Sequence, residues 1–456
     1  MAEAPITAEL RARFPLITSE GAALLRRLEE HAQAPRYTHP GVDRLTSDGL
    51  RRLAEFEAEL SGQADWLPGQ PPAWLDDYLA ACYRRVPVYR RRGPAPPGLA
   101  AAPTISRADL AREPWSFVPD DQPLDGLVVY NTSGTTGHPL AIPTHGALAA
   151  PDPDMVALLR AALSCHGLAL PAGPGRVAVA LVAFQRRTYT YAAVSAALDQ
   201  AGFLKVNLSP AEWRDPADRA RFLDDCAPAV ITGDPIAFAE LAALPLTHRP
   251  QALVSTALAL APELARALEA RFGCPVLDLY SLNETGPLAV AQAGVYRLLQ
   301  PRLYVEVLDE AGRPCAPGGR GEVTVTGGFN PFLPLLRYRT NDFAAWERRA
   351  AGPVLVGLEG RPPVVFRARD GTRVNSADVS LALRDLPLAQ YALHQDADGM
   401  LVLRVTPAPV PPGVLRDRLT ALFGPDQPLR VEAVDALTAP AGKLLQFTSD
   451  RPSVGG

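Results

Sequence analysis

The chain has 456 residues, of which 47% are hydrophobic and 21% charged, a composition typical of a soluble protein with two or more domains. Its net charge of −4 gives no reason to expect a nucleic-acid partner. The five cysteines are far apart and suggest neither a metal site nor a disulfide framework, so we expect a reducing, cytoplasmic location. The sequence contains no signal peptide and no membrane-spanning apolar run, so no membrane partner is expected.

Residues 1–68 are expected to form a helical N-terminal extension. Leucines recur at helical spacing in two stretches, at 24–28 and at 50–60. No residue here suggests chemistry, so we expect the extension to serve in packing or in the contact of a homodimer. A cluster of proline and glycine at 67–72 separates it from the rest of the chain.

The segment 127–137 begins with an apolar run that predicts a buried strand and continues into a polar loop. Gly134 and Gly137 allow the backbone to turn and to come close to a ligand. Hydroxyl groups and backbone N–H groups together suit the anionic oxygens of a phosphate chain. The loop is not a Walker loop, because no Gly-Lys-Ser/Thr follows. Its hydroxyl residues are Thr132, Ser133, Thr135 and Thr136.

Strand and helix patterns then alternate along the chain. This alternation predicts an α/β fold with mostly parallel sheets, whose ligands bind at the carboxyl ends of the strands. Strands are expected at 177–184, 203–208, 229–233, 252–256 and 275–279, and helices at 189–200, 219–228 and 260–272.

Two further segments carry candidate binding residues. In 280–286, Tyr280 offers a ring for stacking and Glu284 offers a carboxylate for a hard cation, although a surface acid in a turn is the commoner case. In 336–343, Asp342 offers a carboxylate with two acceptor oxygens. Asn341 before it is tolerated where a positive φ is required. The alternative for 336–343 is a strand with paired surface charges.

The last part of the chain, from about residue 362, predicts short strands and two helices. Strands are expected at 364–367, 391–395 and 400–405, and a helix at 414–423. Lys443 lies in a glycine-containing turn near the end of the chain. Such a lysine is usually solvated, but a mobile ammonium group can also offset charge in a transition state.

In their order along the chain, these segments resemble the motifs of the adenylate-forming superfamily, which includes acyl-CoA synthetases, peptide-synthetase adenylation domains and luciferases. The segments 83–92 and 103–110 are similar to the phenylacetate–CoA ligase branch of that superfamily. The resemblance implies a large α/β domain at 69–360 and a small, mobile α+β domain at 361–456. It also implies that ATP and Mg²⁺ convert a carboxylic acid into an acyl-adenylate, which is passed to a thiol, with coenzyme A as the expected acceptor.

The resemblance also implies roles for single residues. Thr132, Glu284 and Lys443 would be catalytic: Glu284 would bind Mg²⁺, and Lys443 would bridge the reacting carboxylate and the α-phosphate. The nucleotide-binding set would comprise Thr132, Ser133, Gly134, Thr135, Thr136 and Gly137 on the phosphates, Ser255, Thr256, Ala257 and Tyr280 at the adenine, Asn283 at the α-phosphate, Asp342 on the ribose, and Arg361 on the ribose or phosphate.

The sequence departs from the pattern of the family at several positions. His138 replaces a lysine, and Pro362-Pro363 follows Arg361 where a hinge residue is usual, so either the hinge has shifted to residues such as 369–371 or rotation is limited. Gln185–Tyr189 replaces a glycine-containing acyl-site segment. If Arg186 or Arg187 faces the pocket, a polar or anionic acid is expected; a solvated pair is the alternative. His138, Pro362-Pro363 and Ser255-Thr256-Ala257, which replaces a Gly-Ala-Glu of the family, favour a carrier-protein or amine acceptor, or a nucleotide-binding homologue without synthetase activity. The retained segment 132–137, Glu284, Asp342 and Lys443 argue against the last of these.

Overall fold

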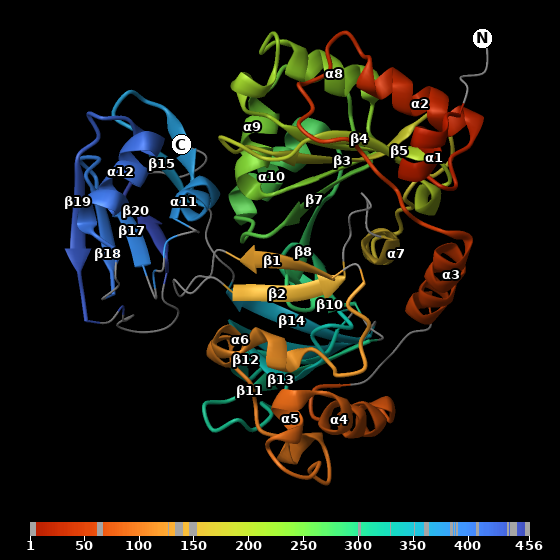
Figure 1. Cartoon of the computed structure of the whole chain (residues 1–456), viewed down its shortest axis with the longest axis vertical. Coiled ribbons are helices and arrows are strands. Elements are labelled where there is room, and N and C mark those ends of the chain that lie inside the picture. Colours follow the sequence, from red (N-terminus) through yellow and green to blue (C-terminus); the bar gives the residue numbers. More distant parts are fainter. Residues whose placement is uncertain are drawn as a thin grey trace.

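The computed structural model describes residues 6–61, 67–125, 127–132, 140–145, 153–299, 302–328, 330–350, 352–359, 364–383, 386, 388, 391–406, 410–435, 437 and 445–451. Figure 1 shows a large part of the chain and, beside it, a smaller C-terminal part drawn in blue. Among the helices of these residues, none is both long and apolar enough to cross a membrane.

The large part is built on a 12-stranded sheet in the order β11-β12-β13-β14-β10-β9-β8-β7-β6-β3-β5-β4. Its central strands β5, β3, β6, β7 and β8 are parallel, so their carboxyl ends meet at one edge. All five predicted strands are present here, and so are the helices predicted at 219–228 and 260–272. The elements are β3 Val177–Ala183, β4 Tyr191–Ser195, β5 Ala201–Asn207, α8 Asp218–Cys226, β6 Val230–Gly233, α9 Pro235–Ala243, β7 Ala252–Thr256, α10 Pro262–Phe272 and β8 Val276–Leu282.

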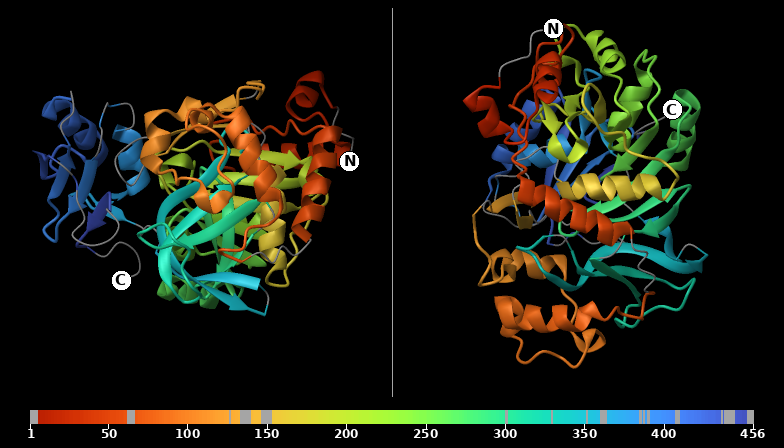
Figure 2. Two further views of the ribbon diagram at one scale, coloured as in Figure 1. Left: turned by 90° about the horizontal axis from the view of Figure 1, so that it is seen from below. Right: turned by 90° about the vertical axis from the view of Figure 1, so that its right-hand side faces the viewer.

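Helices cover both faces of this parallel region. One hydrophobic core lies under α8, α9, α10 and the N-terminal helix α2 (Ser19–Glu29). A second core lies on the other face, under α3 (Ser47–Ser61) and α7 (Pro153–Ser164), which lie side by side in the right-hand view of Figure 2. The predicted leucine face at 24–28 is buried in the first core. The N-terminal helices, which begin with α1 (Ala8–Arg13), are therefore packed as a layer of the large part and are not a detached extension.

The helix predicted at 189–200 is wrong, because this stretch forms β4 and a short 3-10 turn. Asp199 and Gln200 have φ angles of 51° and 68°, which is the left-handed conformation of a tight turn into β5. The Gln200 side chain is held by the N-terminal segment: it accepts from the Thr18 N–H and donates to the Leu16 carbonyl. A hydrogen bond from a segment about 180 residues away cannot be read from local helix propensity.

The second half of the large part is antiparallel. Its strands are β9 Gly286–Gln292, β10 Val295–Leu298, β11 Leu303–Leu308, β12 Arg320–Gly327, β13 Leu335–Arg349 and β14 Gly352–Glu359. A third core joins β13 to α4 (Trp74–Arg85), α5 (Pro87–Arg90), α6 (Arg107–Arg112) and the hairpin of β1 (Leu127–Thr132) and β2 (Leu140–His145).

The small part has a four-stranded sheet in the order β19-β18-β17-β20 and a two-stranded sheet, β15-β16. Their common core includes Phe366, Leu393 and Leu419. The strands and helices predicted after residue 362 are confirmed. The elements are β15 Val365–Arg367, β16 Arg373–Asn375, α11 Ser376–Leu383, β17 Tyr391–Gln395, β18 Leu401–Val405, α12 Pro412–Phe423, β19 Leu429–Ala433 and β20 Phe447–Ser449.

Residues 369–371 do not form a hinge between the two parts. They make the turn of the β15–β16 hairpin, which is closed by a hydrogen bond from the Ala368 N–H to the Thr372 carbonyl. Ala368 belongs to the core of the small part. Rotation at this turn would therefore open that core, and the shifted hinge that the sequence suggested is wrong.

The small part docks on the segment that follows β3. Asn375 Nδ2 donates to the Phe184 carbonyl at 2.9 Å, and the Arg186 N–H donates to Asp378 Oδ1 at 2.9 Å. Arg186 Nη1 donates to the Ala421 carbonyl at 2.6 Å. Arg186 is exposed, as the solvated alternative predicted, and it also joins the two parts of the molecule.

Candidate functional site

The segment predicted to bind phosphate connects two antiparallel strands. In the pairing of β1 with β2, Leu127 lies opposite His145 and Thr132 lies opposite Leu140. Residues 133–139 therefore connect the two strands in sequence. Ser133, Gly134, Thr135, Thr136 and Gly137 are outside the described residues, as is the side chain of Thr132.

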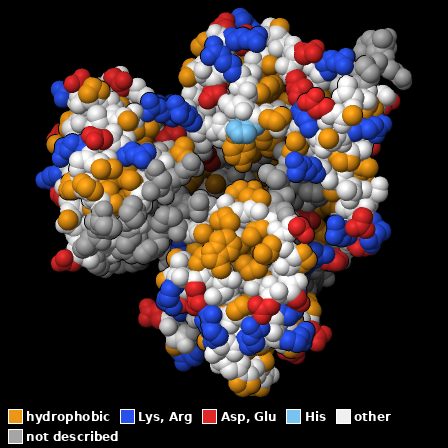
Figure 3. Space-filling view, viewed as in Figure 1, with side chains coloured by type: hydrophobic (Ala, Val, Ile, Leu, Met, Phe, Trp, Pro, Cys, Tyr) orange, Lys and Arg blue, Asp and Glu red, His pale blue; other side chains and the backbone are white. Residues whose placement is uncertain are grey.

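The prediction that the strand before this loop is buried is wrong. Val129 is 38% exposed and Tyr130 44% exposed, because the hairpin packs on the third core mainly through Leu140 and Ile142 of β2. Figure 3 shows hydrophobic side chains gathered over the hairpin and a hollow between it and the part above. Val129 and Tyr130 of β1 are therefore both accessible at the surface of the described structure.

Tyr280 and Asp342, which are 62 residues apart in sequence, meet in the structure. The Tyr280 hydroxyl donates to Asp342 Oδ2 at 2.9 Å, and residue Asp342 is only 7% exposed. The two residues come from the end of β8 and from the middle of β13. Asn341 has a φ of 61°, so the prediction that this position requires a positive φ is confirmed. Burial, followed by the Asp342 charge, raises the pKa of Tyr280 well above its usual value, so the phenol stays protonated.

A cavity of about 110 Å³ lies beside this pair. Ala257, which follows β7 and has a φ of 70°, lines it together with Tyr280 and Asp342. Ser255 is buried nearby on β7, and its hydroxyl has no hydrogen-bond partner among the described residues. The structure therefore brings the predicted residues 255–257, Tyr280 and Asp342 to one edge of the sheet.

Asp278 and Tyr296 also line the cavity, and the sequence gave no indication of either. The Tyr296 hydroxyl donates to Asp278 Oδ2 at 2.5 Å. Burial raises the pKa of Asp278 to about 6. Alternation along β8 puts Asp278 on the same face as Tyr280, which was the signal that could have identified it.

Glu284 is buried in the turn between β8 and β9, at 4% exposure. Its Oε1 accepts hydrogen bonds from Arg107 Nη1 and from the Tyr338 hydroxyl, each at 2.9 Å. Neither partner was predicted, since Arg107 lies 177 residues before Glu284. Asn283 is exposed in the same turn.

The residues present can be tested against the predicted magnesium ion. In the part of the chain that the structure describes, no group of three or more His, Cys, Asp or Glu could hold a metal. Mg²⁺ in nucleotide sites often has one or two carboxylate ligands, with phosphate oxygens and water completing the shell. Glu284 alone fits this pattern, provided that Arg107 shares or releases the carboxylate.

Two predicted residues cannot be compared with the structure. Arg361 and Lys443 lie outside the described residues, between β14 and β15 and before β20 respectively. Their roles stay predictions.

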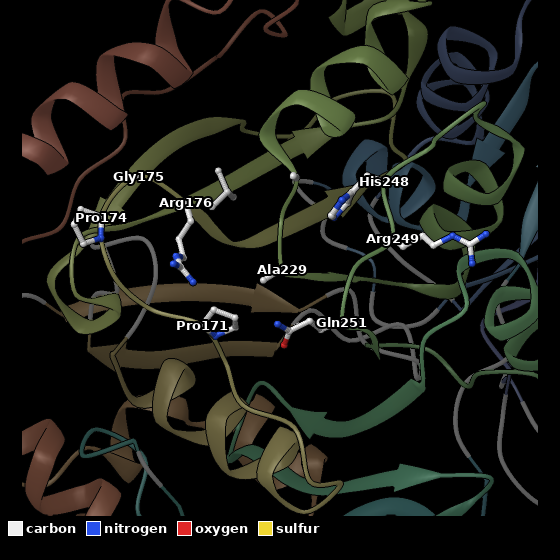
Figure 4. A pocket seen from close by; sticks show the side chains of 10 residues that line it. Pro171, Pro174, Gly175, Arg176, Ala229, His248, Arg249 and Gln251 are labelled. Carbon is white, nitrogen blue, oxygen red and sulfur yellow. The ribbon is translucent and has the colours of Figure 1, made fainter. Parts of the chain in front are cut away.

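A larger cavity, of about 430 Å³, contains none of the predicted residues. As Figure 4 shows, Arg176, His248 and Gln251 lie around it. Arg176 lies just before β3, the lining residue Ala229 just before β6, and His248 and Gln251 before β7, at the amino ends of the parallel strands. Open α/β sheets bind their ligands at the opposite edge, so the smaller cavity beside Tyr280 is the better candidate site.

Comparison with known proteins identifies the family. A family model described as AMP-binding enzyme matches residues 95–330. No curated protein sequence matches the chain. Among solved structures, 2-hydroxyisobutyryl-CoA ligase in complex with 2-HIB-AMP and CoA is similar with a TM-score of 0.52 and 18% identity, over 90% of this chain and 91% of that one.

Two other solved structures are more distant. The amide bond synthetase McbA from Marinactinospora thermotolerans matches with a TM-score of 0.39 and 21% identity, over 72% of this chain and 70% of that one. An acyl-CoA synthetase from Brucella canis matches with a TM-score of 0.35 and 20% identity, over 70% and 62%. The similarity to the 2-hydroxyisobutyryl-CoA ligase shows a shared fold, with a large α/β part and a small α+β part.

Proposed function

From the premise that the chain belongs to the family of AMP-binding enzymes, we propose that it uses ATP to activate a carboxylic acid as an acyl-adenylate, with release of pyrophosphate. The observation that carries this proposal is the buried Tyr280–Asp342 pair beside a cavity at the carboxyl edge of the sheet. This pair offers an aromatic wall for a base and two acceptor oxygens for a ribose. The large domain would span residues 69–360 and the small domain 361–456.

The nucleoside would be bound by residues of β7, β8 and β13. Asp342 would accept hydrogen bonds from both ribose hydroxyls, and its bond from Tyr280 would fix the orientation of the carboxylate. The Tyr280 ring would pack against the adenine, with Ser255, Thr256 and Ala257 along the edge of the base. Asn283 would lie near the α-phosphate.

The chemical step joins two anions, so positioning and charge neutralisation must supply most of the rate acceleration. The attacking carboxylate is ionised at neutral pH and needs no general base. Loop residues 132–137 would donate hydrogen bonds to the phosphates. Lys443 would place an ammonium group between the acid and the α-phosphate, and Arg361 would contact the ribose or phosphate.

Glu284 would hold the magnesium ion that accompanies the triphosphate. When bound, this ion neutralises phosphate charge and orients the triphosphate for displacement of pyrophosphate. Arg107, which contacts Glu284 in this structure, would hold the carboxylate in position before the nucleotide arrives.

Coenzyme A is the first acceptor to test for the acyl group, because a solved structure that shares the fold is a CoA ligase in complex with CoA. The segments 83–92 and 103–110 favour the phenylacetate–CoA ligase-like branch. Transfer to a carrier-protein thiol or to an amine is the second candidate, favoured by His138 in place of a lysine. A nucleotide-binding homologue without synthetase activity is the third.

ATP–pyrophosphate exchange across a panel of carboxylic acids tests the proposal. We expect exchange with at least one acid and its loss in Asp342→Ala. If no acid supports exchange although ATP still binds, the nucleotide-binding homologue without synthetase activity is the remaining candidate. Product analysis with and without coenzyme A then separates the first acceptor from the second.

A further inference from the structure

Lys205 occupies a position that the proposed nucleotide site does not explain. The sequence has lysine only at 205 and 443, and its other long cationic side chains are arginines. Lys205 lies in β5, opposite Tyr191 of β4. Its ammonium nitrogen is 3.4 Å from the centre of the Tyr189 ring. Burial lowers the pKa of Lys205 to about 8 and is the sole cause of the shift, so no described acid compensates the charge.

Aromatic rings form a wall beside this ammonium group. Tyr189 stacks on Tyr191 with ring centres 6.2 Å apart, and Tyr191 stacks on Phe203 at 6.1 Å. His39 contacts the edge of Tyr189, with ring centres 5.6 Å apart. Tyr189 is 49% exposed, so the outer end of the wall is open to a ligand.

The strand register places Lys205 close to the carboxyl edge of the sheet. Lys205 pairs with Leu181 of β3, Leu181 with Thr232 of β6, and Thr232 with Val254 of β7. Residues paired in this way point to the same face of a sheet. Val254 directly precedes Ser255. Lys205 is therefore aligned with the residue just before the candidate nucleotide residues of β7, which are 255–257.

This face is the one opposite the nucleoside cavity. Asp278 and Tyr280 of β8 line that cavity. Leu277, which directly precedes Asp278 and points to the other face, lies in the second core with Val254. Lys205 therefore lies on the face of the sheet opposite Asp278 and Tyr280. Burial, followed by the charges of Tyr189 and of Tyr130 in β1, raises the pKa of Tyr191 in this wall.

An ammonium group that is largely buried without a counter-charge costs free energy. The cation–π contact with Tyr189 offsets part of this cost. An anion bound against the ammonium group would offset more of it, because opposite charges attract strongly where water is excluded.

We propose that Lys205 binds an anionic group of the acid substrate remote from the reacting carboxylate, so that the enzyme prefers acids with a second carboxylate or a comparable anion. This inference rests on the proposed function and names its substrate class. A nucleotide phosphate is the other source of an anion. It is disfavoured because the adenosine residues lie on the opposite face of the sheet.

Calorimetric binding to the full chain, with AMP present, tests this proposal without turnover. The probes are linear and aromatic dicarboxylic acids, such as adipate and terephthalate, each paired with its monocarboxylic analogue, hexanoate or benzoate. We expect at least one dicarboxylate to bind tenfold or more tightly than its partner. Lys205→Met should reduce that ratio to near one, and Lys205→Arg should retain part of it.

Arg187→Met is the matched control, because Arg187 is exposed in the neighbouring segment and is also a cation. It should leave the ratio unchanged. The proposal is overturned if no dicarboxylate is preferred, if Arg187→Met removes the preference while Lys205→Met keeps it, or if Lys205→Met abolishes AMP binding instead. Proper folding of Lys205→Met is checked by its thermal midpoint.

The pH dependence of binding supplies a second readout. The ammonium group is lost as pH rises through about 8, so dicarboxylate affinity should fall above that pH in the wild type and stay flat in Lys205→Met. The phenols of Tyr130, Tyr189 and Tyr191 and the imidazole of His39 also belong to this region. They are unchanged in Lys205→Met, so the pH profile of that variant shows their contribution to the pH dependence. If pyrophosphate exchange fails with every acid while the Lys205-dependent binding persists, the proposed function fails and Lys205 remains only an anion-binding residue. If exchange occurs and Lys205→Met does not change the selectivity among acids, the proposed function stands and the inference fails.

Discussion

At the scale of single residues, the candidate site depends on a hydrogen bond between two side chains that are both nearly inaccessible to water. The Tyr280 hydroxyl holds one oxygen of Asp342, and the Asp342 carboxylate lies beside the cavity. Hydrogen bonds to a charged group contribute about 1.5 to 3 kcal/mol, more than those between neutral groups. The orientation of Asp342 should therefore matter for nucleotide binding even though Tyr280 itself can be replaced by another ring.

We predict a graded loss when the two residues are changed. Asp342→Ala removes both ribose acceptors and should raise KM for ATP about a hundredfold, whereas Tyr280→Phe keeps the ring and should raise it only several-fold. Tyr304→Phe is the control, since its hydroxyl contacts the Leu67 carbonyl far from the cavity. Pyrophosphate-exchange kinetics provide the measurement. Equal effects of Asp342→Ala and Tyr304→Phe would contradict the assignment.

Arg107 and Glu284 form a second residue-scale unit, with side chains 15% and 5% exposed. Removing one partner of a buried ion pair leaves an uncompensated charge and costs about 3 to 5 kcal/mol. Arg107→Met should therefore lower the thermal midpoint by several degrees, and the double variant Arg107→Met/Glu284→Gln should recover most of the loss. Scanning calorimetry measures both. Additive losses in the double variant would show that the pair is not coupled.

At the scale of elements, β13 presents Asp342 by a local departure from regular strand geometry. Arg337 and Asn341 have positive φ angles of 46° and 61°, and the register of β12 and β13 shifts near them. The Asn341 N–H is nevertheless satisfied by Glu322 Oε1 at 2.8 Å. This hydrogen bond holds the irregular backbone of β13, and because it is donated by the backbone it would remain when the Asn341 side chain is replaced.

Substitutions at Asn341 test this geometry. A left-handed conformation costs a residue with a Cβ about 1 to 2 kcal/mol, and glycine and asparagine tolerate it best. Asn341→Gly should keep both stability and KM for ATP, whereas Asn341→Val should lower stability by at least about 1 kcal/mol and raise KM. Thermal midpoints and exchange kinetics measure the two effects. A Val variant equal to the Gly variant would contradict the role of backbone conformation.

The elements also show how far the sequence could predict the site. Strand–helix alternation predicted the parallel strands and the edge that carries Ser255 and Tyr280, because hydrophobic period and turn residues are local signals. It failed at 189–200, where a long-range bond to Gln200 and a left-handed turn produce β4. The Arg107–Glu284 pair joins residues 177 apart and has no local signal.

At the scale of the whole molecule, the small part is held against the large part by a few polar contacts. Arg186 and Asp378 are joined through a backbone hydrogen bond, and Arg373 forms an ion pair with Glu240 of α9 while lying over the Phe184 ring. Inter-domain contacts of this polar kind permit relative motion of domains. A rotation of the small domain would have to break them.

Reversing the charge at this contact should release the small part. Glu240→Arg places like charges together and should increase the radius of gyration in solution, and the double variant Glu240→Arg/Arg373→Glu should restore the compact value. Small-angle X-ray scattering measures both. An unchanged radius of gyration for Glu240→Arg would show that this ion pair does not hold the domains together.

The central claim is that the nucleotide binds at the Tyr280–Asp342 cavity. A crystal structure of the full chain with ATP and Mg²⁺ tests it most directly. We predict both ribose hydroxyls within hydrogen-bond distance of the Asp342 carboxylate, the adenine against Tyr280 and the phosphates at the loop after β1. A nucleotide bound elsewhere, such as at the cavity lined by Arg176 and His248, would contradict this account.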